Sequence, residues 1–294
     1  MTTGSPPAAR PSPRWLGTVL YLPLLMAIGW VLSRPLDLLG APLRADQVNL
    51  VGTVIAFLLL LITLPARLRR VWAEPRPWWR LGVSATGRAM AMALLRGLLM
   101  AALLLGLVSA VMLVSGQARP NVTLTGPRIA NALALMLGVG FAEELIFRGW
   151  LWGELQLQLN GRQAFVAQAL VFALVHARFD LAPMPLLALL GGLLLLGLLL
   201  ATARLSEGGV IWSAVGLHGG LVGGWFALQS GLLTIDPSAP AWMVGPGGTH
   251  PNPIGGWIGW LGLVCLLIAQ RTAVARALRP STGARRASFS GETP

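Results

Sequence analysis

The sequence predicts an all-α, polytopic membrane protein with about eight transmembrane helices, and three observations lead to that prediction. Of the 294 residues, 55% are apolar and only 11% are charged, whereas a soluble domain carries about a quarter charged residues. The mean hydropathy is +0.71. Eight apolar stretches reach or approach the length of about 20 residues that a helix needs to cross a bilayer. We therefore expect the lipid bilayer to be the main partner of this chain.

The charged residues are strongly basic, since 22 arginines, with no lysine, stand against 10 acids and give a net charge of +12. In a soluble protein such an excess would suggest nucleic acid as the partner. The apolar composition favours an anionic membrane surface instead, and we find no nucleic-acid-binding motif. The single cysteine, Cys265, lies in an apolar run, which leaves no internal disulfide to form.

The predicted helices follow one another along a single membrane domain at residues 15–271. The apolar stretches cover residues 15–33, 47–65, 92–114, 129–153, 163–179, 184–203, 210–230 and 255–270. The first has no small-residue cleavage site at its end, so we expect an uncleaved helix. Residues 1–14 are rich in proline and serine and are predicted to be a disordered tail. Residues 272–294 are predicted to be a basic, largely disordered tail.

The distribution of arginine predicts that both ends of the chain lie in the cytoplasm. With eight crossings, the segments on the side of the termini hold fifteen arginines and those on the other side hold five. Arginine accumulates in cytoplasmic segments of membrane proteins, so this bias favours an N-in, C-in topology. The segment 66–91 combines six of the arginines with three tryptophans. It is interpreted either as a chain lying among the lipid headgroups or as a basic cytoplasmic loop.

Five of the seven charged or histidine residues within the apolar stretches, all but Arg96 and Arg178, are candidates for a site, because ionisable groups are costly in lipid and often functional. They are Glu143, Glu144, Arg148, His176 and His218. At 1.5 Å per residue, Glu143 would lie ~15 Å, His176 ~20 Å and His218 ~12 Å from the cytoplasmic ends of their helices. These similar depths predict one shared intramembrane site. The alternative is a set of unrelated polar residues that join neighbouring helices by hydrogen bonds.

The spacing of these residues suggests their roles. Glu144 and Arg148 are four residues apart on one helix face and can form a charge-assisted pair. Glu143 then faces elsewhere and can serve as a general base for hydrolysis when an imidazole and a water molecule are near. A second imidazole can stabilise an oxyanion. The same carboxylate and histidines, Glu143, His176 and His218, could instead bind a divalent metal such as Zn²⁺.

Other residues near these positions have two interpretations. Phe172 stands four residues before His176 and either walls a substrate pocket or packs against neighbouring helices. Four glycines follow His218, at positions 219, 220, 223 and 224, and their small-xxx-small spacing favours close helix packing over an open pocket. His250 lies in a segment rich in proline and glycine and is interpreted as a solvated loop residue outside the site.

Three sequence motifs in this region resemble those of the CPBP family of intramembrane proteases, which includes CAAX prenyl endopeptidases and bacteriocin-immunity-type (Abi) proteins. The family pattern is EExxxR, then FxxxH, then a histidine followed four residues later by asparagine or a related residue. The chain has EELIFR at 143–148, FALVH at 172–176 and His218 in glycine-rich surroundings. The resemblance covers a core of about 130–228, and the ordered motifs make it specific.

The resemblance implies a role for each matched residue. Glu143 and His176 would activate water, His218 would assist as an oxyanion or metal partner, and Glu144 and Arg148 would support the site. The chain departs from the pattern at Val222, which stands where the family has asparagine and cannot donate a hydrogen bond. Family members are treated both as metalloproteases and as metal-independent glutamate enzymes, so the resemblance leaves the cofactor open.

The sequence thus predicts an intramembrane endopeptidase that cleaves membrane-associated proteins or peptides at a site opening toward the cytoplasmic half of the bilayer. Its composition, rich in arginine, glycine and alanine, suggests a prokaryotic inner membrane protein. Two alternatives stay open at this stage. The protein could be a catalytically inactive scaffold or immunity-type protein, or a permease for small molecules or protons that uses the carboxylates as a relay.

Overall fold

The structure is a computed structural model that describes residues 15–38, 43–248 and 250–278. The predicted tail at 1–14 and the last part of the predicted tail, 279–294, lie outside these residues. The chain divides into two compact units, Met1–Arg80 and Leu81–Pro294, which we describe separately. The sequence had predicted one membrane domain at 15–271.

Unit 1 is a pair of apolar helices with two short additions. It contains α1 (Trp15–Ser33), α2 (Pro35–Leu38), α3 (Ala45–Val71) and α4 (Pro77–Arg80). The helices α1 and α3 approach closely because glycines meet at their contact: a methyl group added at Gly29 would lie 2.3 Å from the carbonyl oxygen of Gly52. The hydroxyls of Tyr21 and Thr63 are 2.7 Å apart across the same pair. The predicted spans 15–33 and 47–65 are therefore helical, and the second continues to Val71.

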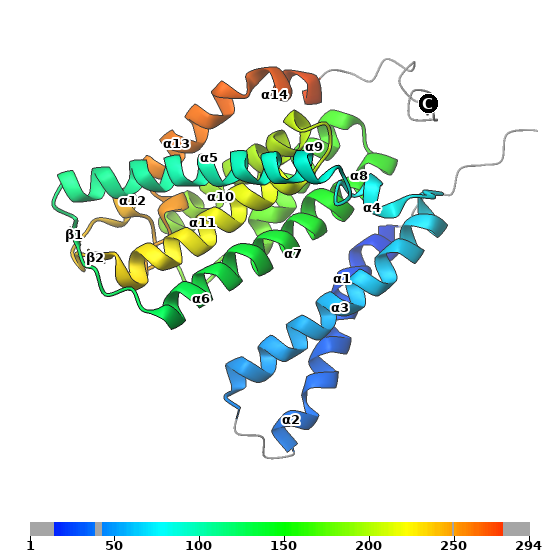
Figure 1. Cartoon of the computed structure of the whole chain (residues 1–294), viewed down its shortest axis with the longest axis horizontal. Coiled ribbons are helices and arrows are strands. Elements are labelled where there is room, and N and C mark those ends of the chain that lie inside the picture. Colours follow the sequence, from blue (N-terminus) through cyan, green and yellow to red (C-terminus); the bar gives the residue numbers. More distant parts are fainter. Residues whose placement is uncertain (1–14, 39–42, 249, 279–294) are drawn as a thin grey trace, which may run out of the picture. The chain divides into compact units, whose positions relative to one another are not determined.

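Unit 2 is a helical bundle with a small two-stranded ladder (Figure 1). In chain order it contains α5 (Gly87–Val114), β1 (Ala118–Pro120), α6 (Gly126–Ala134), η1 (Leu135–Val139), α7 (Gly140–Glu144), η2 (Leu145–Leu151), α8 (Trp152–Gln158), α9 (Gly161–Val175), α10 (Pro183–Ser206), α11 (Trp212–Gly231), β2 (Leu233–Ile235), α12 (Ala241–Val244), η3 (Pro253–Gly255), α13 (Trp257–Ala269) and α14 (Arg271–Leu278).

The central helix of unit 2 is α11, which packs on α5 on one side and on the α6–α7 run on the other. Glycines allow these close approaches. A methyl group added at Gly97 of α5 would lie 2.1 Å from the Ser213 carbonyl oxygen, and one added at Gly219 would lie 2.0 Å from that of Met136. The glycines after His218 therefore serve helix packing, as their spacing predicts.

The elements from α6 to α8 form one uninterrupted helical run, Gly126–Gln158, in which the segments η1 and η2 are π-helical. A π segment adds a residue to a turn and shifts the side chains that follow it. The short helix α7, which carries Glu143 and Glu144, lies between the two π segments. The carboxylates are thus presented with an offset that a regular α-helix would not have.

Unit 2 has two distinct ends. At one end, Ala118 of β1 pairs with Ile235 of β2 in the antiparallel ladder, and α12 lies nearby (left in Figure 1). We call this the ladder end. At the opposite end, the backbone N–H of Ile211 donates to the Gly82 carbonyl at 3.0 Å, and Arg96 pairs with Glu207 at 2.6 Å.

The membrane character of the chain is confirmed. Five helices are long and apolar enough to cross a bilayer, namely Trp15–Asp37, Ala45–Val71, Gly87–Val114, Gly126–Gln158 and Pro183–Ser206. Two further apolar helices, Gly161–Val175 and Trp257–Ala269, are shorter. Five of the eight predicted transmembrane helices are therefore supported by the structure, and the N-in, C-in topology stays a prediction.

The structure also contains elements that the sequence analysis did not anticipate. The ladder of β1 and β2 joins the two connections that follow α5 and α11. The helix α14 occupies the beginning of the predicted C-terminal tail. Its arginines at 271 and 276 leave it with little apolar surface, which is why composition alone suggests a disordered segment.

Candidate active site

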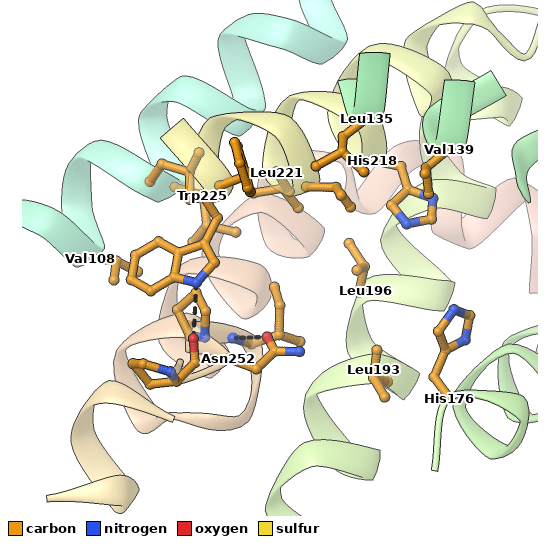
Figure 2. A pocket seen from close by; sticks show the side chains of 18 of the residues that line it. Val108, Leu135, Val139, His176, Leu193, Leu196, His218, Leu221, Trp225 and Asn252 are labelled. Carbon is orange, nitrogen blue, oxygen red and sulfur yellow. Dashed lines mark hydrogen bonds between the residues drawn. The ribbon is translucent and has the colours of Figure 1, made fainter. Parts of the chain in front are cut away.

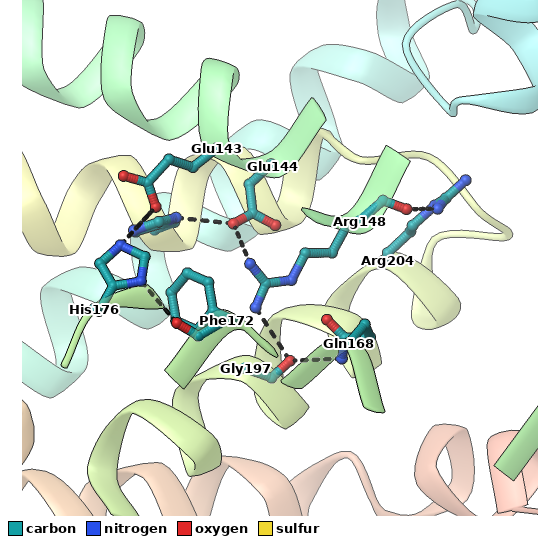
Figure 3. Close-up of polar contacts among 9 residues, drawn as sticks. Glu143, Glu144, Arg148, Gln168, Phe172, His176, Gly197 and Arg204 are labelled. Carbon is teal, nitrogen blue, oxygen red and sulfur yellow. Dashed lines mark hydrogen bonds and ion pairs between the residues drawn. The ribbon is translucent and has the colours of Figure 1, made fainter. Parts of the chain in front are cut away.

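Two acidic residues on α7 form the centre of the candidate site, and each faces a different set of partners (Figure 3). The side chains of Glu144 and Arg148 are completely buried and pair through Oε1 and Nη1 at 2.9 Å. This is the i, i+4 pair predicted from the spacing. The same Oε1 of Glu144 lies 2.8 Å from Nδ1 of His218 on α11. Glu144 therefore joins the guanidinium to one of the two site histidines.

Glu143 faces both histidines. Its Oε2 lies 3.2 Å from Nε2 of His176 and 3.7 Å from Nε2 of His218. The side chains of Glu143 and His176 are 25% and 33% exposed, in contrast to Glu144. The structure thus assembles all five ionisable residues from three separate helical segments into one cluster, which is the shared site predicted from their depths. Glu143 and His176 form its accessible side.

His176 does not lie inside a helix, as the predicted span 163–179 implied. Helix α9 ends at Val175, and His176 is its C-cap residue. Its Nδ1 lies 2.8 Å from the Phe172 carbonyl oxygen, one of the carbonyls that a helix end leaves without an amide partner. Because a carbonyl only accepts, Nδ1 carries the hydrogen and Nε2 is turned to Glu143. The early end of α9 therefore orients the imidazole.

Phe172 packs at the centre of this cluster. It is 1% exposed, and its ring centroid lies 4.6 Å from that of His176 and 5.6 Å from that of His218. The guanidinium carbon of Arg148 lies 4.3 Å from the same centroid. Phe172 thus fixes the positions of both imidazoles and also contributes to the cavity wall. Both interpretations of this residue from the sequence apply.

Two further polar residues lie beside Arg148, and the sequence analysis did not assign them to the site: Gln168 shares an acceptor with Arg148, and Arg204 bonds to its backbone. Nη2 of Arg148 and Nε2 of Gln168 each donate to the Gly197 carbonyl at 3.3 Å. Arg204 donates to the backbone carbonyl of Arg148 and, through Nε, to that of Gly209 at 2.9 Å. Gln168 and Arg204 are polar residues within or at the end of apolar helices, which is the signal that could have identified them.

An apolar cavity of about 430 Å³ leads to this cluster (Figure 2). Glu143, His176 and His218 line it at its polar end, and Val222 also lines it, as proposed for the substrate pocket. Most of the remaining wall is leucine, valine and aromatic side chains. Trp225 is held at the wall by a hydrogen bond from Nε1 to the Pro251 carbonyl at 2.9 Å.

The structure agrees with the interpretation of His250 as a loop residue outside the polar cluster, since it lies in the segment between α12 and η3. The structure adds that His250, together with Asn252, lines the cavity. Its side chain is exposed, so it lies at the mouth rather than in the polar cluster. Composition identified the loop correctly but could not reveal that the loop folds over the bundle.

The metal alternative was tested against the side chains present. Among the described residues, no group of three His, Cys, Asp or Glu side chains could hold a metal ion. Nδ1 of His218 faces Glu144 and Nδ1 of His176 faces the Phe172 carbonyl, so Nε2 of both rings is turned toward Oε2 of Glu143. These contacts do not exclude a metal, because histidines that bind metals engage their other ring nitrogen in the same way. The metal set of Glu143, His176 and His218 therefore stays a prediction.

Comparison with known families assigns two regions of the chain. Residues 5–76 match a domain of unknown function (DUF8676). Residues 125–223 match the family described as type II CAAX prenyl endopeptidase Rce1-like, and this region includes every ionisable residue of the cluster. No curated protein and no solved structure matches the chain. The chain therefore carries, at residues 125–223, a domain of the CPBP family of intramembrane proteases.

Proposed function

We propose that the protein is an intramembrane endopeptidase that hydrolyses peptide bonds in membrane-associated proteins, with Glu143 and His176 activating water and His218 stabilising the reacting carbonyl. The observation that carries the proposal is the meeting of one carboxylate oxygen, Oε2 of Glu143, with two imidazoles at the polar end of an apolar cavity. The family match supports proteolysis as the class of reaction.

The orientation of His176 supports its role in proton transfer. Its Nδ1 donates to a backbone carbonyl, so Nε2 of the neutral ring is a lone pair directed at Glu143. Glu143 and His176 can hold one proton between them. In the proposed reaction, Glu143 takes a proton from water as the water attacks the substrate carbonyl. The proton then passes to the leaving nitrogen, with His176 holding Glu143 in position.

The charges of the cluster determine how many protons it holds. Glu143 and Glu144 supply two negative charges and Arg148 supplies one positive charge. In a low-dielectric site a net charge is costly. One additional proton, shared among Glu143, His176 and His218, makes the cluster neutral.

His218 is placed to donate to the developing oxyanion. Its Nδ1 lies 2.8 Å from Oε1 of Glu144, and this contact fixes the orientation of the ring. A hydrogen on Nε2 of this ring would point toward the region of Glu143. Hydrogen bonding to a developing oxyanion in a water-poor site accounts for several kcal/mol in enzymes of known mechanism. Val222, on the same helix, offers no second donor.

Replacement of Glu143 by glutamine tests this proposal, because the side chain keeps its shape and loses its basicity. Peptide-terminus profiles of membranes are compared between cells that express the wild-type chain and cells that express Glu143→Gln. Termini that disappear with Glu143→Gln are expected. The matched control is Glu207→Gln, which changes a glutamate paired with Arg96 at the opposite end of the unit.

Identical profiles for the wild type and Glu143→Gln under several growth conditions would refute proteolysis. That outcome would favour the inactive scaffold or immunity-type protein, which requires the packing of the cluster and not its basicity. A proton-coupled permease would instead give pH-dependent uptake in proteoliposomes. The distribution of arginine and the composition support a prokaryotic inner membrane as the location of the proposed enzyme.

A further inference from the structure

We infer that the cavity opens toward the non-cytoplasmic side of the membrane, so that the substrate is an apolar segment of a membrane protein on that side. The part of the inference that concerns a substrate rests on the proposed function. The direction in which the cavity opens does not depend on that function. It differs from the opening toward the cytoplasmic half that the sequence suggested.

The lining of the cavity comes from the halves of the helices that lead to the ladder end. Helix α5 contributes residues 104–108 of Gly87–Val114, and α11 contributes residues from His218 onward. The segment 250–254, which follows α12, completes the wall. Figure 2 shows Trp225 and Asn252 at one end of the cavity and the two histidines at the other. The cavity thus extends from the polar cluster toward the ladder end.

The short helix α9 explains why the cavity lies there. At 1.5 Å per residue, α9 spans about 22 Å and its neighbour α10 about 36 Å. Their packing places Ala169 of α9 against Gly197 of α10, so α10 continues well beyond the last turn of α9. His176, at the end of α9, is therefore recessed within unit 2. Arg178 and His250, both exposed, lie at the mouth of this recess.

The other side of the cluster is closed. Glu144 and Arg148, which lie behind Glu143 and His218, are completely buried. Arg204 is 6% exposed and covers the backbone of Arg148 from the opposite end. No residue of the connections at the opposite end, within the described part of unit 2, lines the cavity. A substrate would reach Glu143 from the ladder end.

The arginines assign the two ends of unit 2 to the two sides of the membrane. Within unit 2, the opposite end carries Arg88 at the start of α5, Arg162, Arg204, Arg271 and Arg276. The ladder end carries Arg119, Arg128 and Arg178, and Arg178 is paired with Asp180 at 2.7 Å. By the positive-inside rule, the opposite end is cytoplasmic and the ladder end is not.

The wall of the cavity indicates the chemistry of the substrate. Leu104, Val108, Leu193, Leu196, Leu221 and Trp225 line it, and such side chains favour apolar groups over charged ones. A segment that crosses the outer half of the bilayer, or lies just outside it, presents apolar side chains at this level. A charged cytoplasmic tail would have to cross the buried cluster of Glu144 and Arg148 to reach the same place.

Cysteine labelling tests the direction of the opening without requiring activity. In a full-length Cys265→Ala background, single cysteines are placed at Phe179, which is 86% exposed next to Arg178, and at Gly87, where added atoms meet open space at the start of α5. A membrane-impermeant maleimide is applied to intact bacterial cells. Phe179→Cys should be labelled, and Gly87→Cys should be labelled only after permeabilisation. Val122→Cys, 85% exposed, repeats the ladder-end test.

Labelling of Gly87→Cys in intact cells, alone or together with the ladder-end positions, would overturn the inference.

The substrate is tested with two membrane-anchored reporters that carry the same apolar segment on either the non-cytoplasmic or the cytoplasmic side. Cleavage of the first alone, lost in Glu143→Gln, is expected. Cleavage of the second that depends on Glu143 would overturn the inference and leave the proposed protease standing. Cleavage of neither, with the expected labelling, would refute the protease and leave the direction of the opening standing.

Discussion

Replacing Arg148 with methionine is expected to destabilise unit 2 strongly. The substitution removes the guanidinium that neutralises a completely buried carboxylate and keeps an unbranched side chain of similar length. Glu144 would keep His218 as its neighbour, but the cluster would lose its permanent positive charge. A buried carboxylate without its ion-pair partner is costly because no water can replace the lost contact.

The size of the effect follows from the contacts of the guanidinium. The hydrogen bond to Glu144 at 2.9 Å is charge-assisted, and such bonds contribute about 1.5–3 kcal/mol. The position over the Phe172 ring, at 4.3 Å, adds about 2 kcal/mol when water is excluded. The total, about 3–5 kcal/mol, agrees with the loss seen when one partner of a buried ion pair is removed.

The assay is the free energy of unfolding in mixed micelles, followed by tryptophan fluorescence during a detergent titration. The matched control is Arg96→Met, since Arg96 pairs with Glu207 at 2.6 Å but is 55% exposed. Pairs of that kind contribute about 0–1 kcal/mol. The double variant Glu144→Gln with Arg148→Met removes both charges and should recover part of the loss. If Arg148→Met costs no more than Arg96→Met, the buried pair does not stabilise the site as we argue.

Three other changes test the packing, the reaction and the cofactor. Gly219→Ala should lower the free energy of unfolding by about 1–3 kcal/mol and lower activity, because the added methyl group meets the Met136 backbone and displaces His218. In the control Gly106→Ala the added methyl group meets no other atom, so neither unfolding nor activity should change. Val222→Asn should raise kcat in the reporter cleavage assay by adding an amide donor to the cavity wall, while Val222→Leu should not, and equal rates would contradict this role. Chelator treatment of the purified protein should leave reporter cleavage unchanged, and a loss that Zn²⁺ restores would contradict our metal-free mechanism.

Much of the fold could be predicted because lipid imposes a simple constraint on sequence. Apolar runs located the helices at 15–33 and 184–203 to within a few residues, since every backbone group inside a bilayer must find its partner within the segment. The end of α9 was placed four residues late, because 176–179 (HARF) contains no proline or glycine that would mark the end of the helix. The π segments and the β ladder leave no mark in hydropathy.

Much of the candidate site could be predicted for a related reason. Ionisable groups are so costly in hydrocarbon that Glu143 and His218 stand out against their surroundings. Gln168 and Arg204 also stand out as polar residues within or at the end of apolar helices, but arginine near a helix end is common and was interpreted as a topology signal. The place of His250 in the cavity wall could not be found from the sequence, because it depends on how the segment 250–254 folds back onto α10 and α11.

The sequence by itself determined that the chain is a membrane protein, which residues are candidates for its chemistry and which family pattern they follow, because composition and motif order are local properties. Only the tertiary structure decided which histidine nitrogen meets which carboxylate oxygen and on which side of the cluster the cavity lies. These depend on where α9 ends and on the two π segments beside Glu143. Such offsets of a few ångströms arise from packing between helices distant in sequence, which no single segment encodes.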